Sequence, residues 1–450
     1  MEKKQKTPMS VRLCYGSGAA SSNVINTVLG SFLLAYYTDT ALIGVAAIST
    51  MLLLARFLDA GTDVVMGCLV DRTNTRWGKA RPWLFLAALL TPIGIILILN
   101  VPMGWSDSGK LIYAYLTYIF LNCIVCTIHG IAYPTLLARM TIDYKDRALT
   151  SAICSICNNI SGVVIGSVIP VLVSKLGWSK SSVILGILSG VLLLITVFGV
   201  KEKIGIDEST EKRNAQKVPM KVALPIVLKN KYFYIMMLIG IFMLILNANA
   251  ISSMVYYCNE VIGDPMFMTK LMSIGQIPGI LILFFMPIVS KKVGKHRFML
   301  FGVLMCLVGF IILGLADGNR TMTLIGTILR STGISPVIAG AFAYIADIAD
   351  FGEWKSGIRT EGLISSAQSI GSKIGIGIGS AMTGGILAAT GYVGGASKQS
   401  AEAIMGIKFT FGWLGAILSI FLLVCIILLD VEKYMPEVKV HLERKYADNH

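Results

Sequence analysis

Three charged side chains fall on one face of a segment that is otherwise apolar. Arg56, Asp59 and Asp63 follow one another at three- and four-residue spacing, which places them on a single helical stripe. A charge inside a membrane costs at least about 2.5–3.5 kcal/mol, so we expect this stripe to face a cavity rather than lipid. Two carboxylates one turn apart repel each other unless a cation lies between them. The pattern predicts a site for Na⁺, Li⁺ or a proton, with Thr62 as a further oxygen ligand; the alternative is that Arg56 only pairs with Asp59.

Lys373 is a second charge in an apolar surrounding. It lies in Ser369-Ile-Gly-Ser-Lys-Ile-Gly-Ile-Gly-Ile-Gly379, where small residues permit close contact between helices. A lysine in such a place needs an anion, and the stripe at Asp59 and Asp63 is the expected partner. A pair that changes when a cation binds would act as a switch, whereas the alternative is a permanent structural salt bridge.

Neutral polar side chains also occur inside apolar segments. His129 follows a long apolar run, and it suits either a hydrogen-bonded packing role or a role in binding a solute or a proton. Asn23 and the pair Asn158 and Asn159 carry amide groups that suit the hydroxyls of a sugar. Amides also simply join helices together, so these residues alone do not define a site.

The elements that position these side chains are membrane-spanning helices. The chain has 450 residues, of which 55% are hydrophobic and only 14% charged, and a soluble domain would lack polar surface at this balance. Apolar runs of about 20 residues, the length of a transmembrane helix, recur along it. We therefore predict an all-α integral membrane protein with twelve transmembrane helices in two six-helix bundles. The predicted helices are 15–37, 42–70, 83–102, 110–138, 148–174, 181–200, 231–258, 267–290, 297–316, 321–347, 361–390 and 405–430.

The distribution of charge predicts the orientation. Most of the 39 Lys and Arg residues lie in the termini and in alternate connections, and Arg56, Arg330 and Lys373 fall inside helices. By the positive-inside rule both termini are cytoplasmic. The net charge of +14 is therefore attributed to orientation rather than to nucleic acid, and membrane lipid is the expected surrounding. The nine cysteines lie mostly in apolar stretches and show no pattern of a metal site or a disulfide framework. The charged N-terminus lacks a cleavage signature and is read as retained.

A polar connection divides the chain into two halves. The predicted organisation is an N-terminal bundle at 1–200, a cytoplasmic linker at 201–230, a C-terminal bundle at 231–430 and a cytoplasmic tail at 431–450. The turn Arg76-Trp-Gly-Lys-Ala-Arg-Pro-Trp83 and the turn Lys292-Val-Gly-Lys-His-Arg-Phe298 follow corresponding helices of the two halves. Such duplication places a solute site near the middle of the bilayer, with alternating access; the alternative is two unrelated basic loops.

Motifs for enzymatic chemistry are not found in the sequence. It contains no phosphate-binding loop, no His-Glu-X-X-His and no nucleophile elbow, so we predict neither an enzyme nor a bound cofactor. Energy for transport would then come from an ion gradient or from a partner.

Several segments together resemble one family. They are Asp59-Ala-Gly-Thr-Asp63, Arg76-Trp-Gly-Lys-Ala-Arg-Pro-Trp83, Tyr133-Pro-Thr-Leu-Leu, Met140-Thr-Ile-Asp-Tyr-Lys-Asp-Arg147 and Asp350-Phe-Gly-Glu-Trp-Lys-Ser-Gly-Ile-Arg-Thr-Glu-Gly362. From about Tyr15 to Tyr392 the chain resembles the glycoside–pentoside–hexuronide:cation symporters, the melibiose permease relatives of the major facilitator superfamily. The resemblance implies that Asp59, Thr62, Asp63 and Thr127 hold the coupling cation. It also implies that Arg56 and Lys373 occupy family positions near the two sites.

The sequence departs from melibiose permease at positions that contact the sugar in that relative. Asn23 and Gly130 stand where it has acidic residues, and Ser155 lies near the position of its arginine. These changes argue against melibiose as the solute and favour a sugar acid, because Lys373 meets less competition from carboxylates. Thr62 replaces an amide of the relative and is expected to affect the preference between Na⁺ and H⁺.

The sequence therefore predicts a secondary transporter of the bacterial inner membrane that couples a cation to a glycoside, pentoside or hexuronide. The expected partners are this small solute, the coupling cation and lipid, and no nucleic acid. Asn23, Arg56, His129, Ser155 and Lys373 are the candidate residues for solute binding or coupling. Two alternatives remain: the same fold carrying a non-sugar organic solute, and a membrane sensor that transports nothing. The charged stripe disfavours the sensor.

Overall fold

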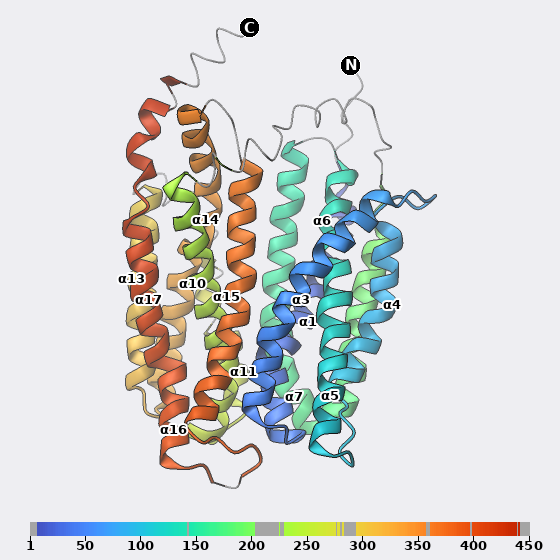
Figure 1. Cartoon of the computed structure of the whole chain (residues 1–450), viewed down its shortest axis with the longest axis vertical. Helices are drawn as coiled ribbons and strands as arrows, with labels where there is room; N and C mark the ends of the chain where they lie inside the picture. The colour runs from blue at the N-terminus through green and yellow to red at the C-terminus, as the bar shows by residue number, and fades with distance from the viewer. Residues whose placement is uncertain are drawn as a thin grey trace. The chain divides into compact units, whose positions relative to one another are not determined.

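The computed structural model shows a helical protein. It describes residues 7–141, 144–202, 225, 229–275, 277–279, 281–282, 294–356, 361–396, 398–438 and 440–441. In that part of the chain the regular structure is helical, apart from one isolated bridge between Thr75 and Gly78. The chain divides into two compact units, and within each unit the helices run roughly parallel or antiparallel to one another (Figure 1).

Unit 1 comprises Met1–Glu211, Asp264–Ser273 and Gly391–Ser400. Two short segments from the second half of the chain therefore belong to it. Its elements are α1 (Met9–Thr27), η1 (Val28–Phe32), α2 (Leu33–Ala35), η2 (Tyr36–Thr40), α3 (Val45–Arg72), α4 (Arg81–Ile98), α5 (Asp107–Tyr118), η3 (Ile119–Cys126), α6 (Thr127–Met140), α7 (Tyr144–Gly199) and α11 (Phe267–Ser273).

Unit 2 comprises Lys212–Gly263, Ile274–Thr390 and Ala401–His450. Its elements are α10 (Lys231–Tyr256), η4 (Tyr257–Val261), α13 (Lys295–Leu315), α14 (Arg320–Ser356), α15 (Glu361–Ala389), α16 (Ala401–Lys408), η5 (Phe409–Trp413), α17 (Leu414–Ile427) and η6 (Val431–Tyr434). The predicted linker lies largely outside the described residues, so the proposed boundary at 201–230 stays a prediction.

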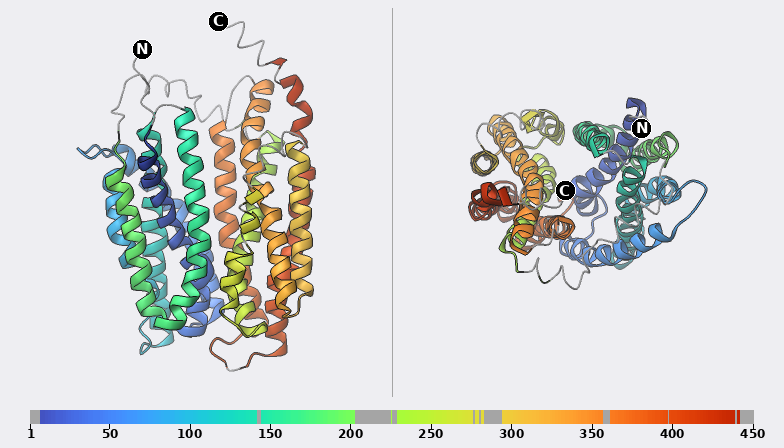
Figure 2. Two further views of the ribbon diagram at one scale, coloured as in Figure 1. Left: turned by 180° about the vertical axis from the view of Figure 1, so that it is seen from behind. Right: turned by 90° about the horizontal axis from the view of Figure 1, so that it is seen from above.

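The described part of each of the twelve predicted spans is largely helical, and the predicted fold class is confirmed. α7 contains two of the spans, because Gly177 at φ 74° breaks the helix and the chain turns back there (Figure 2, left). The eighth span, 267–290, lies only partly within the described residues: α11 covers its start. Within the described residues, eight helical stretches are long and apolar enough by themselves to cross a membrane. α3, which carries the charged stripe, runs from Val45 to Arg72 as one continuous helix.

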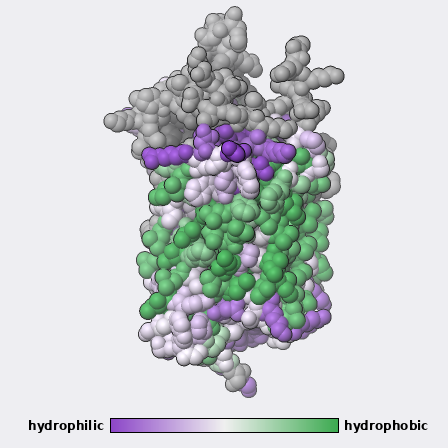
Figure 3. Space-filling view, turned by 90° about the vertical axis from the view of Figure 1, so that its right-hand side faces the viewer, coloured by the Kyte–Doolittle hydropathy of each residue, from purple (hydrophilic) through white to green (hydrophobic). Residues whose placement is uncertain are grey.

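The surface explains why the sequence is so apolar. Large hydrophobic side chains such as Ile112, Leu116 and Phe301 are more than half exposed, each at 57–64%. On the face shown in Figure 3, hydrophobic side chains form a band between two hydrophilic rims. A band of this kind is stable against lipid and unfavourable in water, as expected for a membrane-embedded protein.

The core of unit 1 joins its helices through buried apolar side chains. Tyr15 of α1, Leu84 of α4, Leu136 of α6 and Leu193 of α7 belong to one cluster. At its centre Tyr15 and Tyr133 stack with ring centroids 4.3 Å apart, and each hydroxyl donates to the backbone carbonyl of the other residue. This reciprocal contact fixes α1 against α6, which carries Thr127.

In unit 2 glycines allow α10 and α15 to approach closely. A Cβ added at Gly371, Gly375 or Gly379 would lie 2.5–2.8 Å from a backbone carbonyl oxygen of α10. The three glycines recur every four residues and therefore form one stripe along α15. The close contact predicted from small residues around Lys373 is thus present in the backbone, with α10 as the neighbour.

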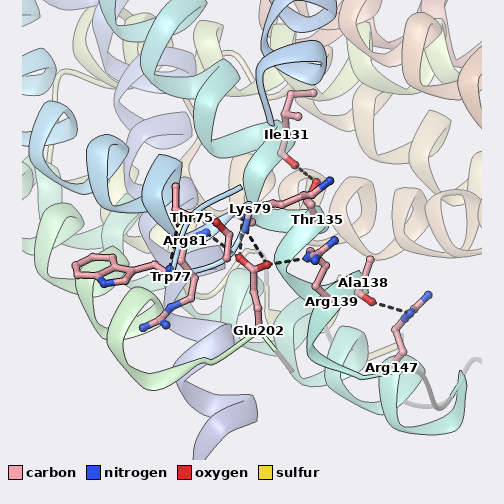
Figure 4. A network of polar contacts seen from close by, with 12 residues as sticks. Thr75, Trp77, Lys79, Arg81, Ile131, Thr135, Ala138, Arg139, Arg147 and Glu202 are labelled. Carbon is pink, nitrogen blue, oxygen red and sulfur yellow. Dashed lines mark hydrogen bonds and ion pairs between the residues drawn. The ribbon is translucent and has the colours of Figure 1, made fainter. Parts of the chain in front are cut away.

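A glutamate after the sixth predicted span holds one end of unit 1 together (Figure 4). The carboxylate of Glu202 accepts backbone N–H groups from Lys79, Ala80 and Arg81 at 2.8–3.1 Å, at the start of α4. It also accepts the Nε–H of Arg139, in α6, at 2.7 Å. An anion at a helix N-terminus satisfies donors that have no partner within the helix.

Candidate cation and solute site

Oxygen atoms from two helices meet at the charged stripe. The Thr127 hydroxyl donates to Oδ1 of Asp59 at 3.3 Å, and the Thr62 hydroxyl donates to the backbone carbonyl of Asp59 at 3.0 Å. The two hydroxyl oxygens, of Thr62 and Thr127, lie 3.3 Å apart. Each hydroxyl has one hydrogen, so once both donate to Asp59, lone pairs of the two oxygens face each other. Such an arrangement suits a cation or a hydrogen-bond donor rather than a further acceptor.

Local helix geometry brings Thr127 to this place. It is the first residue of α6 and directly follows η3, a π-helical stretch from Ile119 to Cys126. A wider π-helical turn changes the direction in which the following side chains point, and such turns are frequent at functional sites. One turn earlier the thiol of Cys123 contacts the carbonyl oxygen of Ala55 at 3.5 Å, so the two helices are close along this whole stretch.

Burial of the site decreases from Asp59 to Asp63. Asp59 is 8% exposed and Thr127 is 4% exposed, whereas Thr62 and Asp63 are only half-buried. Both aspartates have further interactions with their surroundings. In the part of the chain that the structure describes, no three His, Cys, Asp or Glu side chains are grouped to hold a metal ion. A bound Na⁺ would therefore depend on hydroxyl oxygens as well as on the two carboxylates.

Asn23 lies in a second polar cluster of unit 1. Its amide nitrogen donates to the backbone oxygen and the side-chain oxygen of Asn158, both at 3.0 Å. Its amide oxygen accepts the Thr27 hydroxyl at 3.1 Å. Both amide hydrogens are thus used to join α1 to α7. A solute would have to compete with Asn158 for these donors.

His129 is a core residue in this structure. It is 5% exposed, stacks on Tyr133 with ring centroids 5.1 Å apart, and has Nε2 3.2 Å from the carbonyl oxygen of Gly18. A carbonyl only accepts, so Nε2 carries the hydrogen. The geometry favours the packing alternative for His129, and Thr127, two residues earlier, is the α6 side chain that reaches Asp59.

Ser155 is not brought to the oxygen cluster. It is exposed and donates to the carbonyl of Ser151 in its own helix at 3.0 Å. The side chains of Arg56 and Lys373 lie outside the described residues, although their backbones belong to α3 and α15. Their roles stay predictions.

Two features were not found by sequence reasoning. Glu202 was counted only as part of a polar linker, although it directly follows the sixth span as Glu432 follows the twelfth, and this repeat was a usable signal. Arg330 was recognised inside a helix but given no role. Its isolation from acidic residues in α14 was the available signal.

With this geometry established, comparison with known proteins identifies the family. Residues 14–433 match the family model described as "MFS/sugar transport protein", and the chain belongs to this family. The chain is therefore a multi-pass membrane transporter, not an enzyme.

Curated relatives cover most of the chain. It is 28% identical to the "Isoprimeverose transporter" of Lactiplantibacillus pentosus, over 99% of this chain and 93% of that protein. It is 29% identical to the "Glucuronide carrier protein homolog" of Escherichia coli, over 88% and 86%. It is also 29% identical to the "Putative glycoside/cation symporter YagG" of Escherichia coli, over 90% and 88%.

A solved structure confirms the fold. The crystal structure of the nucleoside transporter NupG covers 93% of this chain and 98% of its own, with a TM-score of 0.61 at 14% identity. The arrangement of helices is therefore that of the major facilitator superfamily.

Proposed function

We propose that this protein is a symporter that couples a cation to a glycoside or a sugar acid by alternating access. The observation that carries the proposal is the meeting of Asp59, Thr62 and Thr127, with Asp63 one turn further along α3. Relatives named as sugar transporters or as a glycoside/cation symporter support a small sugar-like solute and a coupling cation.

The coupling ion is proposed to be Na⁺, Li⁺ or H⁺, bound between the carboxylates of Asp59 and Asp63. A cation there relieves their mutual repulsion, and the hydroxyls of Thr62 and Thr127 supply neutral oxygen ligands. Coupling then means that the cation and the solute each increase the affinity of the protein for the other by the same factor.

The proposed location is the inner membrane of a bacterial cell with both termini cytoplasmic. The support is the excess of Lys and Arg in alternate connections, according to the positive-inside rule. Among solutes, the family resemblance and the names of the relatives favour glycosides, pentosides and hexuronides over a non-sugar organic molecule.

Uptake into proteoliposomes tests the proposal. Purified protein is reconstituted, and labelled neutral glycosides and hexuronides are offered while Na⁺, Li⁺ and pH are varied separately. We expect stimulation by one cation that is lost in Asp63→Asn and Asp59→Asn. Asp107→Asn, which removes an acid from the first turn of α5, is the matched control and should behave like the wild type. Uptake of a sugar that no cation stimulates would refute symport, and uptake of organic acids alone would favour the non-sugar carrier.

A further inference from the structure

A buried arginine of unit 2 lacks an anionic partner. Arg330 of α14 is only 5% exposed. Within the described part of the chain its guanidinium makes neither a hydrogen bond nor an ion pair; it lies 5.8 Å from the centroid of the Phe310 ring and interacts electrostatically with the buried thiol of Cys306. Arginine stays charged in proteins, and an aromatic ring compensates only a fraction of a buried charge. The structure therefore contains a fixed cation that needs an anion.

Close helix packing fixes the position of this side chain. A Cβ on Gly309 of α13 would lie 2.5 Å from the backbone nitrogen of Arg330, so the two helices touch at this residue. Phe310 is held from its other side by α17, where a Cβ on Gly415 would meet its ring at 2.2 Å. The backbone of Arg330 is thus fixed at the crossing of α13 and α14, and the guanidinium can reach only as far as its side chain extends from this point.

Space remains beside the guanidinium. In the described part, no nitrogen of Arg330 is both fully enclosed and without a hydrogen-bond partner. The guanidinium nitrogens make no hydrogen bond, so they must border space that a water molecule can reach. Lipid chains would be an unfavourable neighbour for a charge, so the space suits water or an anion.

The depth of Arg330 indicates which anion. It follows the start of α14 at Arg320 by ten residues, or about 15 Å of helix, and the hydrocarbon layer is about 30 Å thick. Arg330 is then near the middle of the membrane, where the phosphate of a lipid headgroup does not normally lie. A small soluble anion is the better candidate, and a planar carboxylate matches the two-pronged donor geometry of a guanidinium.

We propose that Arg330 binds the carboxylate of an anionic solute, so that the protein prefers sugar acids over neutral glycosides. This inference rests on the proposed function and specifies its solute. It assigns the recognition of the acid group to unit 2, through a residue other than Lys373.

Two probes that differ only in the acid group test this. p-Nitrophenyl β-glucuronide and p-nitrophenyl β-glucoside share the same aglycone, and their affinities are measured by calorimetry on the full chain in phosphatidylcholine nanodiscs. Loss of a charge-assisted hydrogen-bond pair should weaken the glucuronide by about 10- to 100-fold in Arg330→Gln and leave the glucoside unchanged. Arg330→Lys should retain part of the preference. Arg320→Gln, an exposed arginine of the same helix, is the control and should retain all of it.

Other results overturn the inference. An unchanged affinity for the glucuronide in Arg330→Gln, or an equal loss for both probes, would mean that the guanidinium only supports packing. Nanodiscs that contain phosphatidylglycerol test whether a lipid occupies the site instead. If this lipid stabilises the wild type but not Arg330→Gln, and glucuronide binding is unchanged in the variant, the site binds a lipid phosphate.

A second measurement keeps the test independent of sugar binding and of the folding of one variant. Thermal denaturation of the wild type and of Arg330→Lys is compared in sodium acetate and in sodium chloride with glucose at equal ionic strength. Stabilisation by acetate that is reduced in Arg330→Lys supports the carboxylate site even if neither glycoside binds and the proposed function fails. Equal stability in both solutions, together with no binding of the glucuronide, would refute the carboxylate site, whereas the proposed function is tested separately by cation-stimulated uptake of neutral glycosides.

Discussion

The two units each place a glutamate against the first turn of a helix that follows a Gly-Lys-X-Arg turn. In unit 1 Glu202 accepts three backbone N–H groups at the start of α4 and the guanidinium of Arg139. In unit 2 Glu432 of η6 accepts one backbone N–H, from His296 at 3.2 Å, and the hydroxyl of Tyr344 at 3.1 Å. A glutamate thus caps the start of a helix in both halves of the chain, but its carboxylate accepts from four donors in unit 1 and from two in unit 2.

The difference shows that two similar turns can keep their backbone conformation while their partners differ. Both turns begin with a glycine of positive φ, Gly78 at 107° and Gly294 at 88°, so the backbone of the turn has been kept. The partners have changed. In unit 2 the lysine of the turn, Lys295, pairs instead with Asp347 of α14. Unit 1, which carries the proposed cation site, thus has its helix ends held by one buried carboxylate, whereas unit 2 divides the task between two acids.

Removal of the Glu202 carboxylate should have the largest effect. Glu202→Ala leaves three backbone donors and Arg139 without this acceptor, and the loss of such a partly buried charged group costs about 3 kcal/mol. We expect a clear fall in the melting temperature of the purified protein in detergent. Glu202→Gln should lie between this variant and the wild type, because an amide oxygen still accepts. A melting temperature equal to that of Glu432→Ala would remove the asymmetry inferred above.

The glycine of each turn sharpens the comparison. A Cβ on Gly78 would lie 2.2 Å from the carboxyl carbon of Glu202, whereas a Cβ on Gly294 would have Oε1 of Glu432 at 3.8 Å. Gly78→Ala therefore adds displacement of the carboxylate to the backbone strain of positive φ, about 2 kcal/mol in all, while Gly294→Ala has only the strain, about 1 kcal/mol. A double-mutant cycle of melting temperatures checks this: Gly78→Ala should cost less when Glu202 is already alanine. Independent, additive effects would contradict the contact.

Features of the fold and the site that depend on one helix could be predicted from the sequence, whereas features that depend on the contact between two helices could not. Apolar length predicted the spans, and the spacing of Asp59 and Asp63 predicted a common face, because both are properties of one segment. The approach of Thr127 to Asp59 was implied by the family resemblance alone. That the Asn23 amide binds Asn158, rather than facing an open cavity, depends on the register between α1 and α7, which periodicity does not encode.

The same reason explains the other differences. His129 was left open between packing and a functional role, and its contact with the Gly18 carbonyl follows from the crossing of α1 and α6. The span 42–70, by contrast, depended on one segment alone, and α3 runs from Val45 to Arg72 as a single helix.

The acceptor in unit 2 should matter less than the one in unit 1. Glu432→Ala removes one backbone contact and one tyrosine contact, and we expect a loss of about 1 kcal/mol. Tyr344→Phe should cost less than this, and the two changes together should cost little more than Glu432→Ala alone, because the hydroxyl contacts the same carboxylate oxygen. Melting temperatures of the three variants check the order. A larger loss in Tyr344→Phe than in Glu432→Ala would show that the hydroxyl has another role.

A final contrast concerns the charge at the start of the first helix of each unit. In unit 1 Arg12 pairs with Asp146 at exposures of 11% and 5%, whereas in unit 2 Lys231 pairs with Asp430 at 60% and 28%. Burial by itself would raise the pKa of Asp146, but hydrogen bonds from Thr7 and Arg12 outweigh it and hold the pKa below its usual value of 3.8.

Because the folded-state pKa is lowered, the carboxylate of Asp146 contributes its full stability above about pH 4, and this contribution is lost as the pH falls through the lowered pKa. The wild type should therefore be more stable than Asp146→Asn by a constant free energy, about 1 kcal/mol, from about pH 7 down to about pH 4. The corresponding gap in melting temperature should close only below that pH. Asp107→Asn, at the start of α5, should show no such gap. A gap that already closes between about pH 7 and pH 5 would contradict a lowered pKa of Asp146.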